Sequence, residues 1–139
     1  MESLRTHHVG VTVSDLDRLV GFYRDVLGLD LVAEFTVTGA AFAEGVGVPD
    51  ATGHFAHLDG GGARIELVAY EPEGPSRPTG DVNEPGAAHL GFAVDDVDGF
   101  YAELPPEVET VSAPRTTESG TRILFLRDPE GNLVEVLEG

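Results

Sequence analysis

The feature that most constrains the fold of this chain is an internal repeat. His8–Asp17 aligns without a gap on His89–Asp98, and His, Gly, Val and two Asp coincide at an offset of 81 residues. A second match places Arg64–Val68 over Leu133–Leu137 at an offset of 69 residues. Two copies of one unit are expected to share a fold, while the loops between their elements differ in length.

Each copy has the pattern of a strand, a helix and three further strands. Apolar and small residues alternate from Val9 to Val13, which is typical of a strand with one buried face. Ser14 in the first copy and Asp95 in the second are the predicted helix caps, and Gly28 is the predicted end of the first helix. The later strands are expected near residues 30–37, 53–59 and 63–70, and near residues 108–113, 121–127 and 132–138.

The length of 139 residues is sufficient for one domain with a core of its own. We therefore predict a single α+β domain over residues 1–139. Module one is expected at 5–70 and module two at 86–138, joined by a linker at 71–85 that is rich in Pro, Gly and Glu. Because the offset between the copies falls from 81 to 69, the first copy is expected to carry an extra loop at residues 42–49.

Strand alternation selects four candidate metal ligands. His8 and His89 occupy equivalent positions on the face of the first strand that points away from the helix, and Glu66 and Glu135 occupy equivalent positions on the last strand. A pseudo-twofold axis between the copies would bring all four together. Burying two carboxylates without a counter-charge is costly, so the set favours a divalent cation. Zn, Ni, Co, Mn and Fe(II) all accept two nitrogen and two oxygen ligands, and the ligand types do not choose among them.

Other polar residues receive simpler interpretations. His7 is expected on the face opposite to His8. His54 and His57 fall in the third strand of the first copy, where one of them is a candidate for a substrate wall. Arg64 and Arg122 are expected to pair with surface acids.

Composition excludes several classes of partner. The chain has 25 acidic residues against 8 basic ones, all of them Arg, and a formal net charge of −17. Such a field repels nucleic acid and anionic membranes, and high salt would screen its self-repulsion, so a halophilic source is expected. The absence of cysteine leaves His and carboxylates as ligands. With no long apolar run and no signal-like start, the chain is predicted to be cytoplasmic.

Four motifs together carry a resemblance to a known superfamily. They are H-H-V-G-V-T-V-S-D-L-D followed by F-Y-R-D-V-L-G-L, R-I-E-L-V, A-H-L-G-F-A-V-D-D-V-D, and R-D-P-E-G-N-L-V-E. Over nearly its whole length the chain resembles the vicinal oxygen chelate superfamily. That superfamily includes glyoxalase I, methylmalonyl-CoA epimerase, extradiol dioxygenases, fosfomycin-resistance enzymes and bleomycin-binding proteins.

The resemblance implies a fold and a chemistry. Two βαβββ modules would form a cupped mixed sheet around a metal site, with the helices on the outer face and with His8, Glu66, His89 and Glu135 as ligands. The set is similar to that of glyoxalase I, a lyase and isomerase in which the metal polarises a substrate carbonyl and stabilises an enediolate while carboxylates move the proton. By analogy Glu135 is the leading base and Glu66 its partner, acting on a small carbonyl substrate.

Alternative functions remain open at this point. An epimerase of the methylmalonyl-CoA type would use the same two carboxylates. An extradiol dioxygenase would bind Fe(II) through His8, His89 and Glu135 alone and leave Glu66 without a role, as would a fosfomycin thiol transferase. A binding protein of the bleomycin type would need no ligand set. The family commonly forms homodimers, and no motif in the loops at 42–57 and 71–83 names a substrate.

Overall fold

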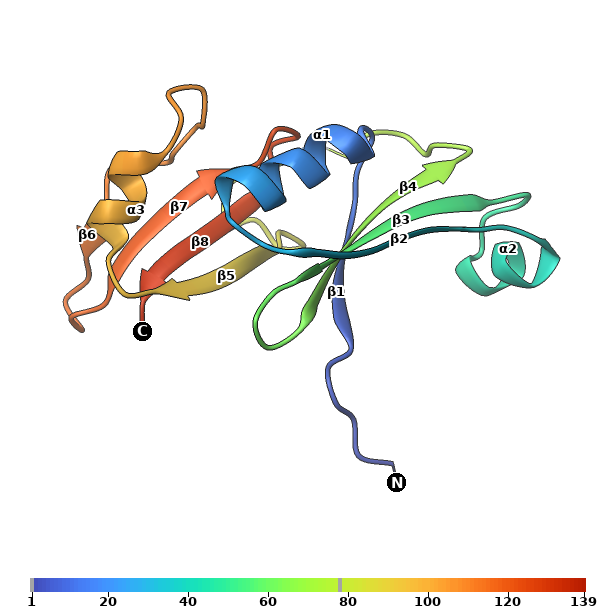
Figure 1. Cartoon of the computed structure of the whole chain (residues 1–139), viewed down its shortest axis with the longest axis horizontal. Helices are drawn as coiled ribbons and strands as arrows, with labels where there is room; N and C mark the ends of the chain where they lie inside the picture. The colour runs from blue at the N-terminus through green and yellow to red at the C-terminus, as the bar shows by residue number, and fades with distance from the viewer. Residues whose placement is uncertain (1, 78) are drawn as a thin grey trace. The chain divides into compact units, whose positions relative to one another are not determined.

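The computed structural model describes residues 2–77 and 79–139. The chain divides into two compact units, Met1–Ser76 and Arg77–Gly139, and the boundary falls inside the predicted linker. Each unit contains one copy of the repeat and one four-stranded sheet (Figure 1). In the part of the chain so described, no helix has the length and apolar character needed to cross a bilayer.

The first unit follows the predicted order of elements, with one helix added. Its elements are β1 (His8–Thr12), α1 (Leu16–Gly21), the π-helical turn η1 (Phe22–Val26), β2 (Leu31–Val37), α2 (Ala40–Val46), β3 (Thr52–Asp59) and β4 (Arg64–Glu71). The strands lie in the order β1-β4-β3-β2, with β1 parallel to β4 and the other neighbours antiparallel. The first and last strands of the unit are therefore neighbours.

The second unit repeats this topology. Its elements are β5 (His89–Val94), α3 (Val97–Glu103), β6 (Arg115–Thr116), β7 (Arg122–Arg127) and β8 (Leu133–Glu138). The strands lie in the order β5-β8-β7-β6, and β5 is parallel to β8. The prediction of an α+β fold built from two βαβββ modules is confirmed.

The strand predicted near residues 108–113 is wrong in detail. Backbone hydrogen bonds from Val111 N to Phe125 O and from Arg127 N to Glu109 O, both 2.9 Å, attach this segment to β7, but only an isolated bridge forms there. The regular strand β6 comes later and has two residues. Pro114 explains the break, because it has no N–H to continue a ladder.

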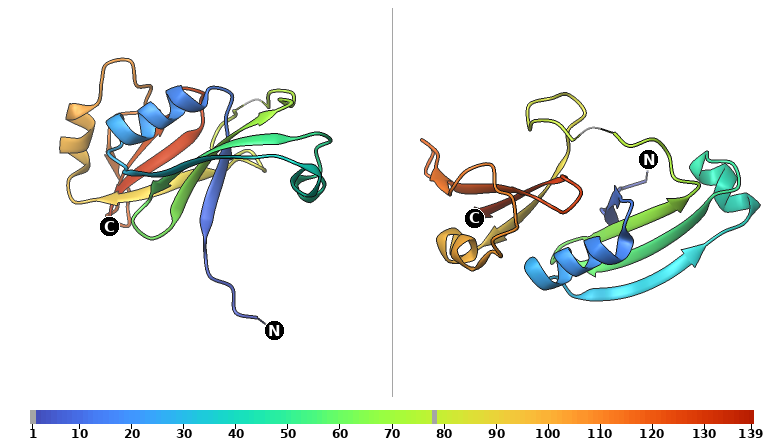
Figure 2. Two further views of the ribbon diagram at one scale, coloured as in Figure 1. Left: turned by 45° about the vertical axis from the view of Figure 1, so that its right-hand side comes forward. Right: turned by 90° about the horizontal axis from the view of Figure 1, so that it is seen from above.

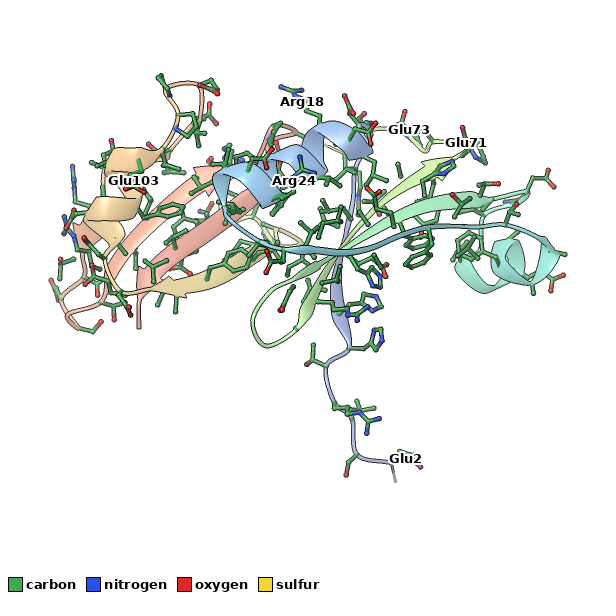
Figure 3. The ribbon with its side chains drawn as sticks, in the orientation of Figure 1. Glu2, Arg18, Arg24, Glu71, Glu73 and Glu103 are labelled. Atoms are coloured by element: carbon green, nitrogen blue, oxygen red, sulfur yellow. The ribbon has the colours of Figure 1, made fainter. Side chains whose placement is uncertain are left out.

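In each unit a helix covers one face of the sheet. Figure 2 shows α1 along one side of the first sheet and α2 beyond the end of its strands. Arg18 and Arg24 project from the exposed side of the first helical segment (Figure 3). The residues buried between this segment and its sheet are Leu19, Val20, Tyr23, Ala56, Leu58, Ile65 and Leu67. Their counterparts in the second unit are Val97, Leu124, Leu126, Val134 and Val136.

The helix caps lie one residue later than predicted. Asp15 Oδ1 accepts a hydrogen bond from Arg18 N at 3.2 Å, and Asp96 Oδ1 accepts one from Gly99 N at 3.0 Å. Ser14 was expected to cap α1, but Val13 N still bonds to the backbone of β4, which moves the start of the helix along the chain. The two caps keep the offset of the repeat.

The extra loop predicted at residues 42–49 is largely a helix. Ala40–Val46 forms α2, and its sequence A-A-F-A-E-G-V is rich in alanine, the residue with the highest helix propensity. Gly47 ends the helix at φ 74°, a left-handed conformation that favours glycine. The insertion is thus an ordered element of the first unit.

Candidate metal centre

The first half of the predicted site is formed by β1 and β4. Their parallel register places Gly10 opposite Glu66, and His8 lies two residues earlier on the same face of the sheet. His8 Nε2 and Glu66 Oε1 are 3.6 Å apart. Ile65 and Leu67, on either side of Glu66, are buried against the helix-covered face. The strands thus direct His8 and Glu66 to the face away from α1.

The second half has the same geometry. Gly91 lies opposite Glu135 in the parallel register of β5 and β8, and His89 Nε2 is 3.5 Å from Glu135 Oε1. The exposed fractions also match. The side chains of His8 and His89 are 40% and 41% exposed, while those of Glu66 and Glu135 are 14% and 19% exposed. The repeat therefore extends from sequence to side-chain placement.

Each His–Glu pair is suited to a divalent ion. Separations of 3.6 and 3.5 Å are long for a hydrogen bond. Two donors that each lie about 2.1 Å from one ion at a tetrahedral angle are about 3.4 Å apart. The structure brings His8 to Glu66 and His89 to Glu135, each within its own unit. Binding of one ion by all four residues stays a prediction.

A third polar residue contacts the first pair. The antiparallel register of β3 and β4 places His57 opposite Glu66, and His57 Nε2 lies 2.7 Å from Glu66 Oε2. His57 is only 5% exposed. The sequence suggested at most a substrate wall for this histidine. The register of the hairpin at residues 60–63 was the signal that could have paired it with Glu66.

Arg64 completes a hydrogen-bonded chain behind Glu66. Its Nη1 lies 3.2 Å from His57 Nδ1, so its observed contact is with this histidine and not with the surface acid that was expected. A guanidinium only donates hydrogen bonds, so His57 Nδ1 accepts and the ring proton is on Nε2. His57 therefore donates to Glu66.

The remaining histidines have separate partners. His7 was expected on the face opposite to His8, but its Nδ1 lies 2.9 Å from His8 Nδ1. Alternation does not extend to His7, because β1 begins at His8. This contact engages Nδ1 of His8 and leaves Nε2 directed at the carboxylate. His54 lies between Thr36 and Glu71, at 3.1 Å from each, and is not part of the site.

In the second unit, the described residues form no such hydrogen-bonded series at Glu135. The register of β7 and β8 places Phe125 opposite Glu135, at the position that His57 occupies in the first unit. Phe125 contacts the ring of His89, with 5.1 Å between ring centroids. Leu133 stands where the first unit has Arg64. In the described residues, His89 is the only side chain found in polar contact with Glu135.

An aromatic cluster adjoins His57 on the same face of the first sheet. Phe35 contacts His57 edge-on at 5.1 Å and stacks on Phe55 at 5.1 Å. Tyr70 and Phe42, the latter from α2, extend the cluster to the end of the strands. Phe35 is 41% exposed. The first pair is thus bordered by an apolar surface within its own unit.

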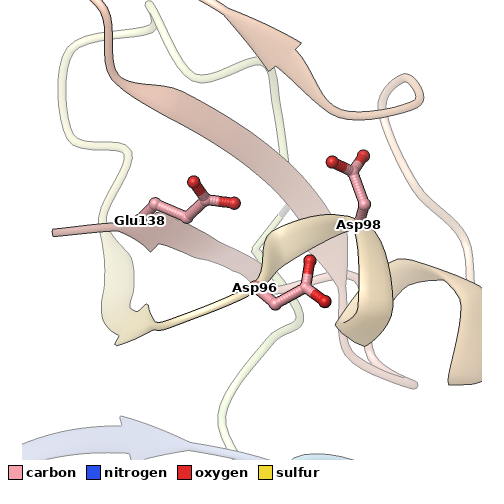
Figure 4. Close-up of side chains that lie close together, drawn as sticks. All are labelled: Asp96, Asp98 and Glu138. Carbon is pink, nitrogen blue, oxygen red and sulfur yellow. The ribbon is translucent and has the colours of Figure 1, made fainter.

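A separate acidic cluster contains Asp96, Asp98 and Glu138, drawn in Figure 4. One carboxylate oxygen from each lies within 4.8 Å of the others. All three have structural partners at the start of α3. Asp96 caps the helix, Glu138 accepts from Val97 N at 3.0 Å, and Asp98 pairs with Arg122 at 2.8 and 2.9 Å. These bonds account for the cluster without an ion, and the Arg122 pair is the predicted surface pair.

The Asp98–Arg122 pair makes a pH-dependent contribution to stability. The hydrogen bond from Arg122 lowers the pKa of Asp98 from its ordinary value of 3.8. A lowered native pKa stabilises the fold above 3.8, and this contribution is lost as the pH falls through the native value. Asp98→Asn is therefore expected to unfold at a lower temperature than wild type at pH 7. The difference, measured by thermal unfolding, should shrink as the pH is lowered below 3.8, and a difference that stays the same from pH 7 to low pH would contradict this origin.

The comparisons with known proteins agree with this fold. The family model described as Glyoxalase/Bleomycin resistance protein/Dioxygenase superfamily matches residues 5–136. The chain belongs to this superfamily, as its motifs predicted.

Relatives with different names share this similarity. The uncharacterized protein YaeR of Escherichia coli is 31% identical, over 96% of this chain and 95% of that protein. A 2-epi-5-epi-valiolone epimerase of an Actinomyces species is 28% identical, over 97% and 79%. A glyoxalase family protein from Bacillus cereus superposes with a TM-score of 0.88 at 26% identity, over 99% and 95% of the two chains. A lactoylglutathione lyase from Agrobacterium tumefaciens gives 0.66 at 26% identity, over 100% and 96%.

Proposed function

We propose that this protein is a metal-dependent isomerase or lyase of the glyoxalase I type. His8, Glu66, His89 and Glu135 would hold one divalent ion, and the substrate would be a small carbonyl compound. The observation that carries the proposal is the recurrence of one His–Glu pair, at 3.6 and 3.5 Å, in both units. The similarity to the Agrobacterium lactoylglutathione lyase supports the choice of reaction.

The residues suit a proton transfer between adjacent carbons. When bound, the ion would polarise the carbonyl group and so acidify the neighbouring C–H bond. Glu135 takes that proton and returns it to the adjacent carbon, so the reaction is a balanced isomerisation that needs no oxidant. Its carboxylate is 19% exposed, which limits competition from water. The aromatic cluster beside His57 offers a surface for an apolar group of the substrate.

An epimerase is the second candidate. Glu66 and Glu135 are two carboxylates in equivalent positions of the repeat, which suits removal of a proton from one side of a carbon and its return from the other. The similarity to the valiolone epimerase supports this alternative. A dioxygenase, a thiol transferase or a pure binding protein would leave the Glu66 contacts with His8 and His57 without a purpose. A homodimer remains a prediction from family resemblance.

Metal removal tests the proposed function. The purified protein is expected to contain close to one divalent ion per chain and to convert a hemithioacetal substrate. Chelation should lower kcat/KM by about 100-fold or more, because the carbonyl is then no longer polarised, and Zn²⁺, Ni²⁺ or Co²⁺ should restore it. The measurements are metal analysis and steady-state kinetics.

A panel of substrates separates the alternatives. Turnover of methylmalonyl-CoA without turnover of hemithioacetals would favour the epimerase, and catechol cleavage with tightly bound iron would favour the dioxygenase. A metal-free protein in which neither Glu66→Gln nor Glu135→Gln changes metal uptake or activity would contradict the enzyme proposal and favour a binding role.

A further inference from the structure

The two carboxylates of the proposed site, Glu66 and Glu135, differ in the residues that face them from the neighbouring strand. In the first unit, the residue opposite Glu66 is His57, and Arg64 contacts the far side of the same ring. In the second unit both positions are apolar, with Phe125 opposite Glu135 and Leu133 in place of Arg64. Because both positions differ between the units, the first unit has a hydrogen-bonded series of side chains at its carboxylate that the equivalent residues of the second unit cannot form.

The hydrogen bonds that link Arg64, His57 and Glu66 all run in one direction. Arg64 Nη1 donates to His57 Nδ1 at 3.2 Å, and His57 Nε2 donates to Glu66 Oε2 at 2.7 Å. Both ring nitrogens of His57 are thereby engaged. A buried imidazole with an unpaired nitrogen would be destabilising, so the two partners also explain how His57 is tolerated at 5% exposure.

The two oxygens of Glu66 consequently have separate partners. Oε2 is engaged by His57, whereas Oε1 lies 3.6 Å from His8 Nε2, at the separation expected of two ligands of one ion. Phe35 packs edge-on against the His57 ring at 5.1 Å and stabilises its orientation. Glu66 is held in one orientation from behind, in the way that hydrogen-bonded neighbours orient the ligands of metal sites.

We propose that His57 is a positioning residue: its bond to Oε2 would keep Glu66 with Oε1 directed at His8, where it would serve as a metal ligand, whereas no described residue would hold Glu135, the expected base, in this way. This inference rests on the proposed function, because it assumes a metal at the four ligands. It assigns unequal roles to two glutamates that the repeat makes equivalent, and it assigns them through His57 and Phe125.

Binding of Co²⁺ alone to the metal-free protein tests the role of His57. His57→Phe copies the arrangement of the second unit and should weaken Co²⁺ binding about 10- to 100-fold, since Glu66 loses its orienting bond. His57→Gln keeps an N–H donor and should bind Co²⁺ nearly as well as wild type. Calorimetry and the visible absorption of bound Co²⁺ measure the affinity, and urea unfolding checks that each variant is folded.

The results that would overturn the proposal are specific. An unchanged Co²⁺ affinity in a folded His57→Phe variant would overturn the proposal. A His57→Gln variant that binds Co²⁺ as weakly as His57→Phe would overturn it as well. If His57→Phe does not fold, Arg64→Leu at an exposed position removes the first member of the chain. It should then weaken Co²⁺ binding, and unchanged affinity would count against the proposal.

The reciprocal variant gives a second readout with a different sign. Phe125→His places a donor opposite Glu135 and should lower kcat with little change in KM, because a held Glu135 moves less readily, while Co²⁺ affinity should stay equal to that of wild type or rise. An unchanged kcat would contradict the assigned roles. Failure of the two proposals can be distinguished. Wild-type protein that binds Co²⁺ but turns over no substrate would contradict the proposed reaction alone, whereas wild type that does not bind Co²⁺ would overturn both.

Discussion

Replacement of Glu135 by glutamine is expected to lower kcat by about 10³-fold, within the range that general bases contribute. The amide has nearly the shape of the carboxylate, but it cannot accept the proton from carbon. Its oxygen can still approach the ion, so metal content should fall less than activity. Steady-state kinetics on a hemithioacetal, together with metal analysis of the same preparation, measures both quantities.

Glu103→Gln is the matched control for Glu135→Gln. Glu103 is an exposed residue at the end of α3 (Figure 3). Its replacement by Gln makes the same change in charge and shape as the replacement of Glu135. Its kcat should equal that of wild type. Activity of Glu135→Gln within a few-fold of wild type, with metal bound, would show that another group accepts the proton. Glu66 would then be the first residue to test.

Leu67→Ala is expected to cost about 2–5 kcal/mol in the free energy of unfolding, the range for a buried leucine. Leu67 is 0% exposed and lies on the helix-covered face of β4, opposite Val11 of β1 and Ala56 of β3. Truncation would leave a cavity beneath the helix, and the neighbouring strands can close it only in part. Urea unfolding followed by far-UV circular dichroism measures the loss.

Leu4→Ala provides the comparison for the core variant. Leu4 is 96% exposed, so the same deletion of side-chain atoms creates no cavity and should leave the unfolding midpoint unchanged. A loss at Leu67 no larger than that at Leu4 would mean that the sheet and helix repack to fill the space. In that case the arrangement of the first core would not be the one described above.

The sequence predicted the topology because the repeat is a property of the whole chain. Matching His8 to His89 and Glu66 to Glu135 required only an alignment and the alternation of side chains along strands. Leu67 and Val136, each next to a ligand glutamate, are buried on the other face of the strand, in agreement with that alternation. Features that depend on a long regular pattern could therefore be predicted from the sequence alone.

The features that were missed depend on local competition. The cap at Asp15 required knowledge that Val13 N stays in the sheet, and α2 was hidden because an insertion has no counterpart in the other copy. His57 was missed because strand alternation gives its face but not its neighbour. Its contact with Glu66 depends on the register of β3 and β4, which the turn between them sets.

Because the first strand of each unit pairs with the last, each unit holds a His–Glu pair of its own. A single ancestral module with this topology would already hold a complete His–Glu pair, and duplication of its gene would supply the second pair in one event. The residues next to the carboxylate in one copy could then change without loss of a ligand. Phe125 and Leu133 in one copy, against His57 and Arg64 in the other, are the substitutions that such divergence would produce.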